Sequence, residues 1–323
     1  MHAALAVLVW TLAATQPVWS QDPAASYPNK PIRMIVGFAA GGGNDLFARL
    51  IGQKLTENIG QNVVVENKPG AGGRLAVEFV KSQPADGYTL MVAATGAMAI
   101  AAAIYPQLSY HPTRDFVPIT MIANFPLILA GPADDKIKTV KDLVGYGKAN
   151  PDKSNYATSS PAFTITTELF KLKTGMPAVG IPYKSSNEMM LSIAGGNSLF
   201  AIADGPPTMP LIHGGKIRAL AVTGSQRSHE LPDVPSMAEV GYPEVDVGLW
   251  SGLFVSVNTP PAIVRKLDVE LRRVLADAGV RDKLKAMAVN PGGGPGEEFR
   301  QLIDADIKKF ADVAKAANLK FEQ

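Results

Sequence analysis

Residues 32–94 alternate three short apolar runs with two helical patterns, and a glycine-rich turn precedes each helical pattern. The apolar runs predict strands at Ile32–Gly37, Asn62–Glu66 and Thr89–Ala94. The first helical pattern follows the turn Gly41–Gly43 and repeats apolar residues every three or four positions, and the second covers 74–82. Such a strand–helix–strand–helix–strand order within 70 residues predicts a parallel sheet with helices on its faces.

A second series of alternating elements begins near residue 126. The predicted strands are Leu127–Ala130, Asn155–Ala157, Val179–Tyr183, Phe200–Asp204 and Ile217–Thr223, and the predicted helices are 139–149, 164–174 and 187–194. The last third returns to a strand, Gly252–Val257, and to helices that begin near Pro261 and Glu297.

This order predicts an α/β protein of two lobes, the second inserted into the first. The chain would cross between the lobes near Ala123–Phe125 and Gly224–Gln226, which assigns 21–124 and 225–323 to lobe 1 and 125–224 to lobe 2. A length of 323 residues is enough for two lobes of ordinary domain size.

Composition excludes several classes of protein. The 31 Lys and Arg residues nearly balance 29 Asp and Glu residues, and with 46% hydrophobic residues the chain is neither disordered nor built to bind nucleic acid. The absence of cysteine from the sequence excludes disulfides, thiolate metal sites, cysteine nucleophiles and a lipidated cysteine.

The N-terminus resembles a secretory leader. Residues 3–14 form an apolar run too short to span a bilayer, and Val18 and Ser20 stand at the −3 and −1 positions of a signal-peptidase site. We therefore predict that residues 1–20 are a signal peptide cleaved after Ser20 and that the product is periplasmic and soluble. The alternative is a buried N-terminal helix.

The sequence offers no convincing catalytic or metal-binding motif. It contains no His-Glu-x-x-His, and Gly248-Leu-Trp-Ser251-Gly misses the Gly-x-Ser-x-Gly pattern of serine hydrolases by one position. His111, His213 and His229 have no neighbours of ligand type. The glycine-rich turns match neither dinucleotide nor phosphate-loop patterns, so we predict no cofactor, no metal and no enzymatic activity.

Three turns are suited to bind an anion. They are Ala39–Asn44, Thr95–Ala97 and Thr158–Ser160, the last of which precedes Thr164 at a predicted helix start. Each follows a strand, where open α/β sheets bind ligands, and the unpaired N–H groups of a helix start attract a carboxylate. The alternative is that these are tight turns without a ligand.

Four side chains near these turns have competing interpretations. Asp45 and Arg49 are spaced for an ion pair on one helix, and we expect Asp45 to organise the loop rather than contact an anionic ligand. Phe38 and Trp250 favour burial in the core over a role in a pocket or hinge.

Seven motifs in order resemble a known family. They are Tyr27-Pro-x-Lys-Pro-Ile, Phe38-x-x-Gly-Gly-Gly-Asn-Asp45-x-x-Ala-Arg49, Val65-Glu-Asn-Lys-Pro-Gly-Ala-Gly-Gly73, Ala85-Asp-Gly-Tyr-Thr-Leu90, Ile181-Pro-Tyr-Lys184, Gly215-Lys-Ile-Arg-Ala-Leu-Ala-Val-Thr223 and Leu231-Pro-Asp-Val-Pro-Ser236. From about Tyr27 to the C-terminus the chain resembles the Bug family of periplasmic solute-binding receptors of tripartite tricarboxylate transporters.

The resemblance implies a type II periplasmic-binding fold, a Venus flytrap that closes on a small carboxylated solute. A first-lobe loop and a second-lobe loop would grip one carboxylate, and Asp204 matches an acidic position beside the pocket. The ligand-binding residues predicted from the turns and the resemblance are Phe38, Ala39, Ala40, Gly41, Gly42, Asn44, Thr95, Gly96, Thr158, Ser159, Ser160, Thr164 and Asp204.

The sequence departs from the family pattern in both loops. The segment Tyr156–Thr164 is shorter than the family's and lacks its two glycines, and Gly37 and Ala39 replace frequent prolines. Asp204 ends an apolar strand and precedes Gly205-Pro-Pro, so it either points into the cleft or caps the following helix.

Three functions from different classes remain open. The leading hypothesis is a receptor, a monomer, that delivers a small organic acid to the membrane subunits of a tripartite tricarboxylate transporter. The second is a sensor whose ligand-bound form contacts a membrane kinase, without transport. An extracytoplasmic hydrolase is third, because a nucleophile paired with a base is missing from the sequence.

Overall fold

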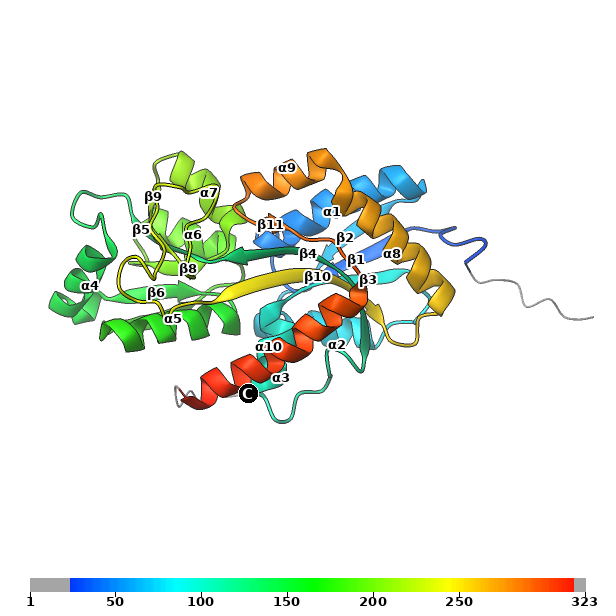
Figure 1. Ribbon diagram of the computed structural model, residues 1–323, viewed down its shortest axis with the longest axis horizontal. Helices are drawn as coiled ribbons and strands as arrows, with labels where there is room; N and C mark the ends of the chain where they lie inside the picture. Colours follow the sequence, from blue (N-terminus) through cyan, green and yellow to red (C-terminus); the bar gives the residue numbers. More distant parts are fainter. Residues whose placement is uncertain (1–23, 317–323) are drawn as a thin grey trace, which may run out of the picture.

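A computed structural model describes residues 24–316 and shows two α/β lobes side by side along the long axis of the molecule (Figure 1). The predicted fold class is thereby confirmed. The predicted signal peptide, residues 1–20, lies outside the described residues. Within 24–316, no helix combines the length and apolar character that crossing a membrane requires.

The first lobe is built on a six-stranded sheet in the order β11–β4–β10–β3–β1–β2. The strand β1 pairs in parallel with β2 and β3, as the glycine-punctuated pattern predicts, whereas β10 runs antiparallel to β3 and β4. The strands are β1 (Ile32–Val36), β2 (Val63–Asn67), β3 (Thr89–Ala94), β4 (Phe116–Pro126), β10 (Gly248–Ser256) and β11 (Asn290–Pro291).

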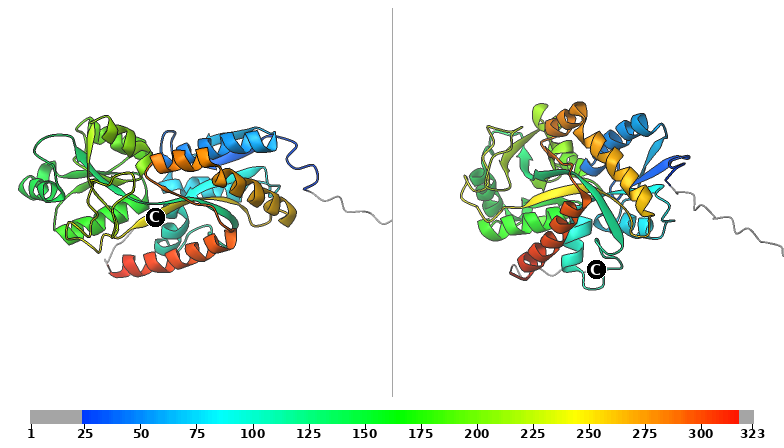
Figure 2. Two further views of the ribbon diagram at one scale, coloured as in Figure 1. Left: turned by 45° about the horizontal axis from the view of Figure 1, so that its top comes forward. Right: turned by 45° about the vertical axis from the view of Figure 1, so that its right-hand side comes forward.

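Helices cover both faces of this sheet (Figures 1 and 2). They are α1 (Gly43–Ile59), α2 (Arg74–Lys81), α3 (Ala101–Ile104), α8 (Pro261–Ala276), α9 (Ala278–Ala286) and α10 (Gly296–Ala316), with a 3₁₀ turn at Ala71–Gly73 and a π-helical turn at Gly96–Ile100. In α1 the spacing of Phe47, Ile51 and Leu55 buries one face of the helix, and Gly60 ends it in the left-handed conformation.

The second lobe contains a three-stranded antiparallel sheet, β8–β5–β9, and a parallel pair, β6–β7. A bridge between Tyr156 and Phe200 links the pair to the sheet. The elements are β5 (Ile128–Pro132), α4 (Val140–Ala149), a 3₁₀ turn (Pro151–Lys153), β6 (Asn155–Thr158), α5 (Pro161–Thr174), β7 (Val179–Pro182), α6 (Ser186–Ala194), β8 (Ala201–Ala203), α7 (Gly205–His213) and β9 (Ile217–Val222).

Two adjacent strands connect the lobes. The long strand β4 leads into β5, and β10 returns alongside β4 from Gly248, opposite Pro126, to Ser256, opposite Phe116. Both strands run between the lobes in Figure 1. The segment before β10 hydrogen-bonds to the end of β9, with the Met237 N–H donating to the Val222 carbonyl at 2.8 Å. The division of the chain at 124 and 225 stays a prediction.

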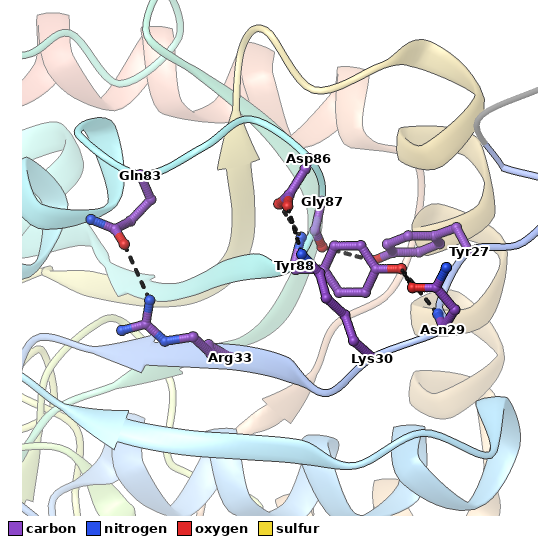
Figure 3. Close-up of polar contacts among 8 residues, drawn as sticks. All are labelled: Tyr27, Asn29, Lys30, Arg33, Gln83, Asp86, Gly87 and Tyr88. Carbon is purple, nitrogen blue, oxygen red and sulfur yellow. Dashed lines mark hydrogen bonds and ion pairs between the residues drawn. The ribbon is translucent and has the colours of Figure 1, made fainter.

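Two of the sequence motifs pack against each other at the outer end of the first lobe (Figure 3). The Tyr27 hydroxyl donates to the Gly87 carbonyl at 2.7 Å, and the Tyr88 hydroxyl donates to Asn29 Oδ1 at 2.9 Å. The two tyrosine rings meet edge to face at 4.9 Å. These motifs therefore hold the segment before β1 against the turn before β3.

Two predicted elements begin three or more residues away from their observed starts. The helix expected from residue 164 begins at Pro161, because Ser160 caps it by accepting a hydrogen bond from the Phe163 N–H and proline suits the first helical position. The strand expected from Gly252 begins at Gly248, because β4 supplies backbone partners along its whole length.

Candidate ligand-binding site between the lobes

The first turns of four helices surround a small cavity between the lobes. The turn before α1 comes from the first lobe, and the starts of α5, α6 and α7 come from the second. The cavity, of about 30 Å³, is lined by Phe38, Gly42, Gly43, Asn44, Ala94, Gly96, Phe125, Ser159, Ser160, Ala162, Phe163, Ser186, Asp204 and Leu249. This small volume shows that the lobes leave little free space over the site.

The arrangement of these helices makes the cavity attractive to an anion. The first N–H groups of a helix lack partners within the helix and carry partial positive charge. Ser160 and Ser185 cap α5 and α6 with their hydroxyls, whereas the starts of α1 and α7 have no side-chain cap. The backbone N–H groups at the start of α1 are therefore suited to receive a carboxylate.

A buried aspartate holds the first-lobe loop in shape. The Asp45 carboxylate accepts hydrogen bonds from the Gly41 N–H at 2.9 Å, from Asn67 Nδ2 at 2.9 Å and from two nitrogens of Arg49. Burial alone would raise the pKa of Asp45, but these hydrogen bonds hold it below its usual value. The predicted role of Asp45 as an organiser of the loop is confirmed.

Asp204 faces the start of α1 from the second lobe. Its side chain is 4% exposed and makes no cap hydrogen bond to α7, so the capping alternative is wrong. A Cβ added to Gly43 would lie 1.8 Å from Asp204 Oδ2, which shows how closely the carboxylate meets α1. Burial raises the pKa of Asp204 to about 6, although hydrogen bonds with Ser186 and the Gly43 N–H act in the opposite direction.

Two polar atoms at the cavity are buried without a hydrogen-bond partner among the described residues: Ser159 Oγ and Asp204 Oδ1. Buried polar atoms are almost always hydrogen-bonded in folded proteins, and an unpaired one costs about 1–3 kcal/mol. Both atoms belong to the second lobe and lie opposite the start of α1. They are therefore available to a solute that carries hydrogen-bond donors.

Seven of the predicted ligand-binding residues line the cavity, and six do not. The lining ones are Phe38, Gly42, Asn44, Gly96, Ser159, Ser160 and Asp204. Among the others, the Ala39 N–H donates to the Lys184 carbonyl across the lobes at 3.5 Å, Ala40 is exposed, and the Gly41 N–H donates to Asp45. Thr95 hydrogen-bonds to the backbone of Trp250. The hydroxyls of Thr158 and Thr164 hydrogen-bond to each other at 2.8 Å. Their role in ligand binding stays a prediction.

The structure adds cavity residues that sequence reasoning missed. They are Gly43, Ala94, Phe125, Ala162, Phe163, Ser186 and Leu249. Phe125 and Leu249 are partners across the connecting strands β4 and β10. The pair Ser185-Ser186 follows β7 and opens α6, and this signal of a helix cap after a strand would have indicated Ser186.

A larger hollow of about 730 Å³ lies against the connecting strands. It shares Phe125 and Leu249 with the small cavity, but its other walls come from 223–230, 285–291 and the middle of α10. Its lining includes the cationic side chains Arg227, Lys285 and Lys309, which attract anions, but the helix starts of the two lobes converge on the interlobe cavity instead.

Two α/β lobes that are joined by crossing strands and close on a cavity between them define a solute-binding protein of the periplasmic type. The chain belongs to the tripartite tricarboxylate transporter family of receptors, whose sequence model matches residues 47–319. It is 32% identical over 321 residues to protein BugT of Bordetella pertussis, and the match covers 98% of each chain.

Solved structures agree with this assignment. Rpa4515 of R. palustris, determined with adipate, has a TM-score of 0.87 and 32% identity and covers 91% of this chain and 99% of its own. MatC of Rhodopseudomonas palustris, with bound malate, has a TM-score of 0.84 and 28% identity and covers 89% of this chain and 99% of its own.

Proposed function

We propose that this receptor captures a small dicarboxylate in the interlobe cavity and delivers it to the membrane subunits of a tripartite tricarboxylate-type transporter. The observation that carries the proposal is the convergence of four helix starts on one small cavity, with the start of α1 lacking a side-chain cap. Adipate and malate in two related structures support the chemical class of the solute.

The two sides of the cavity would recognise different parts of the solute. On the first-lobe side, the start of α1 would bind a carboxylate through the backbone N–H and the side-chain amino group of Asn44, because the Gly43 N–H already donates to Asp204. Asp204, when ionised, accepts hydrogen bonds but repels a carboxylate, so it would select a hydroxyl, an amine or a protonated acid. Between them, Phe38, Phe125 and Phe163 provide an apolar wall for the carbon chain.

Calorimetric titration with a graded panel tests the solute class. We expect wild-type protein to bind malate or adipate and to reject the corresponding diamides, which keep the carbon chain but lose the charge. Binding of the diamides with equal affinity would refute an anion site, and the absence of binding to every carboxylate in a broad panel would refute the proposal.

Delivery and compartment need tests in cells. We propose that the mature chain is periplasmic and begins at Gln21, which N-terminal sequencing of the periplasmic fraction would verify. Deletion of the gene should abolish uptake of the radiolabelled solute that the purified protein binds, and a plasmid copy should restore it. Unchanged uptake together with a lost transcriptional response to that solute would instead support the sensor function.

A further inference from the structure

Ser251 sits directly behind one wall of the interlobe cavity. It belongs to the connecting strand β10, is 0% exposed, and its hydroxyl donates a hydrogen bond to Asn44 Oδ1 at 2.7 Å. The two residues are 207 positions apart in the sequence. Asn44 is the second residue of α1 and lines the cavity.

This hydrogen bond decides which end of the Asn44 amide is available to a solute. A primary amide has one acceptor oxygen and one amino group with two donor hydrogens. Ser251 occupies the oxygen, and no hydrogen bond from Nδ2 to another described residue is present. A carboxylate only accepts hydrogen bonds, so the free amino group is the end that it can use.

The strand that carries Ser251 is firmly held at this point. The Trp250 N–H donates to Thr95 Oγ1 at 2.7 Å, and the Thr95 hydroxyl donates to the Trp250 carbonyl at 3.0 Å. The Trp250 indole N–H donates to Asp306 Oδ2 on α10 at 2.7 Å. Because three hydrogen bonds to two residues anchor Trp250, the hydroxyl of the next residue is fixed in position relative to α1.

We propose that Ser251 is a positioning residue that holds the Asn44 amide with its amino group available to a carboxylate of the solute. Without the Ser251 hydroxyl, the amide can rotate and present its oxygen, which repels a carboxylate. Ser251 would therefore set the preference for an acid over an amide, although it does not touch the solute. This inference rests on the proposed function and identifies a determinant of its selectivity.

The test compares Ser251→Ala with wild type in calorimetric titrations of malate, adipate and the monoamide of the preferred acid. We expect Ser251→Ala to bind the diacid about fivefold or more weakly, as the loss of one hydrogen bond implies. The monoamide should lose less affinity, so the ratio of acid to amide affinity should fall. Ser251→Thr, which keeps the hydroxyl, should restore most of this ratio.

A double-mutant cycle with Asn44→Ala separates positioning from a general effect on folding. If Ser251 acts through Asn44, the double variant should bind no more weakly than Asn44→Ala alone. Ser256→Ala, at the far end of the same strand, serves as the matched control and should bind like wild type. Ser251→Cys, which keeps the volume but donates weakly, replaces Ser251→Ala if that variant does not fold.

Wild-type selectivity in both Ser251→Ala and Ser251→Cys, or additive losses in the cycle, would overturn the inference while leaving the proposed function intact. A wild-type protein that binds no dicarboxylate would overturn both. A change in the acid-to-amide ratio at unchanged urea-unfolding stability supports positioning, because a merely structural role would weaken both ligands equally.

Discussion

At the scale of single residues, we expect Asp204 to have the largest effect on the choice of solute. We expect Asp204→Ala to weaken the binding of a hydroxylated acid such as malate by more than tenfold, or about 1.4 kcal/mol. Adipate, which has no hydroxyl, should lose less affinity. The melting temperature without ligand should hardly change, because the cost of burying the carboxyl group opposes the gain from its hydrogen bonds with Ser186 and the Gly43 N–H. Unchanged affinity beside a large loss of stability would place Asp204 outside the site.

The same carboxyl group should make stability depend on pH. Burial raises the pKa of Asp204 to about 6, whereas an unfolded aspartate titrates near about 3.9. Between these values the folded chain binds a proton that the unfolded chain lacks, so this group's contribution to the unfolding free energy increases as pH falls from 7 to 5. Urea unfolding should show that Asp204→Asn removes this part of the pH dependence. An identical pH dependence in both proteins would contradict the expectation.

Asp45 should make the unfolding free energy depend on pH in the opposite direction. Its pKa is held below the usual value, so its stabilising contribution is complete above the unfolded pKa and is lost as pH falls through the lower folded value. We expect Asp45→Asn to lower the unfolding free energy by about 1.5–3 kcal/mol at pH 7, since hydrogen bonds to a buried charge are lost. The difference in unfolding free energy between Asp45→Asn and wild type, measured by urea unfolding, should shrink below pH 3. A difference that stays constant would show that the charge of Asp45 is not its cause.

At the scale of elements, sequence patterns located most strands and helices, but they missed β4 and α9 and could not show which helix starts meet. The run from β1 to β3 was predictable because apolar periodicity and glycine turns are local signals. The contact between Gly43 and Ser186 could not be predicted, because 143 positions separate the two residues. In the sequence, each residue is sufficiently explained as part of its own turn. Ser160 was predicted as a site residue, yet the helix it caps was placed three residues late, since Thr164 also resembles a helix start.

The facing starts of α1 and α7 give a prediction about closure. In Gly43→Ala the new Cβ would lie 1.8 Å from Asp204 Oδ2, so closure should be hindered and solute affinity should fall. The helix itself should not suffer, because alanine favours helix over glycine. In the Asp204→Ala background, where the obstructing carboxylate is absent, Gly43→Ala should cause little further loss of solute affinity. Titration calorimetry would measure this.

Gly145→Ala is the matched control, because a Cβ at this helical glycine of α4 meets no atom within 4 Å. It should bind like wild type. Equal losses from Gly43→Ala with and without Asp204 would show that the carboxylate is not the obstacle.

At the scale of the whole molecule, the cavity of about 30 Å³ is far smaller than the about 300–1,000 Å³ of most small-molecule sites. A dicarboxylate can therefore be accommodated only if the lobes part from this arrangement to admit it and then close around it, and β4 and β10 are the strands that must bend. We expect the lobes to rest apart in solution when no solute is bound. Small-angle scattering should show a smaller radius of gyration with saturating solute than without it. An unchanged radius, with binding shown by calorimetry on the same sample, would indicate a rigid pocket.

The closed cavity also has a kinetic consequence. Because a bound solute has no room to leave between closed lobes, its escape rate cannot exceed the rate at which the lobes part. Contacts between the lobes that do not touch the solute, such as Gly72 against Pro161, then contribute to residence time as directly as the groups that touch it. Two receptors with identical pocket side chains can thus differ in how long they retain the solute. A membrane partner that separates the lobes would control the release of the solute without competing for its binding site.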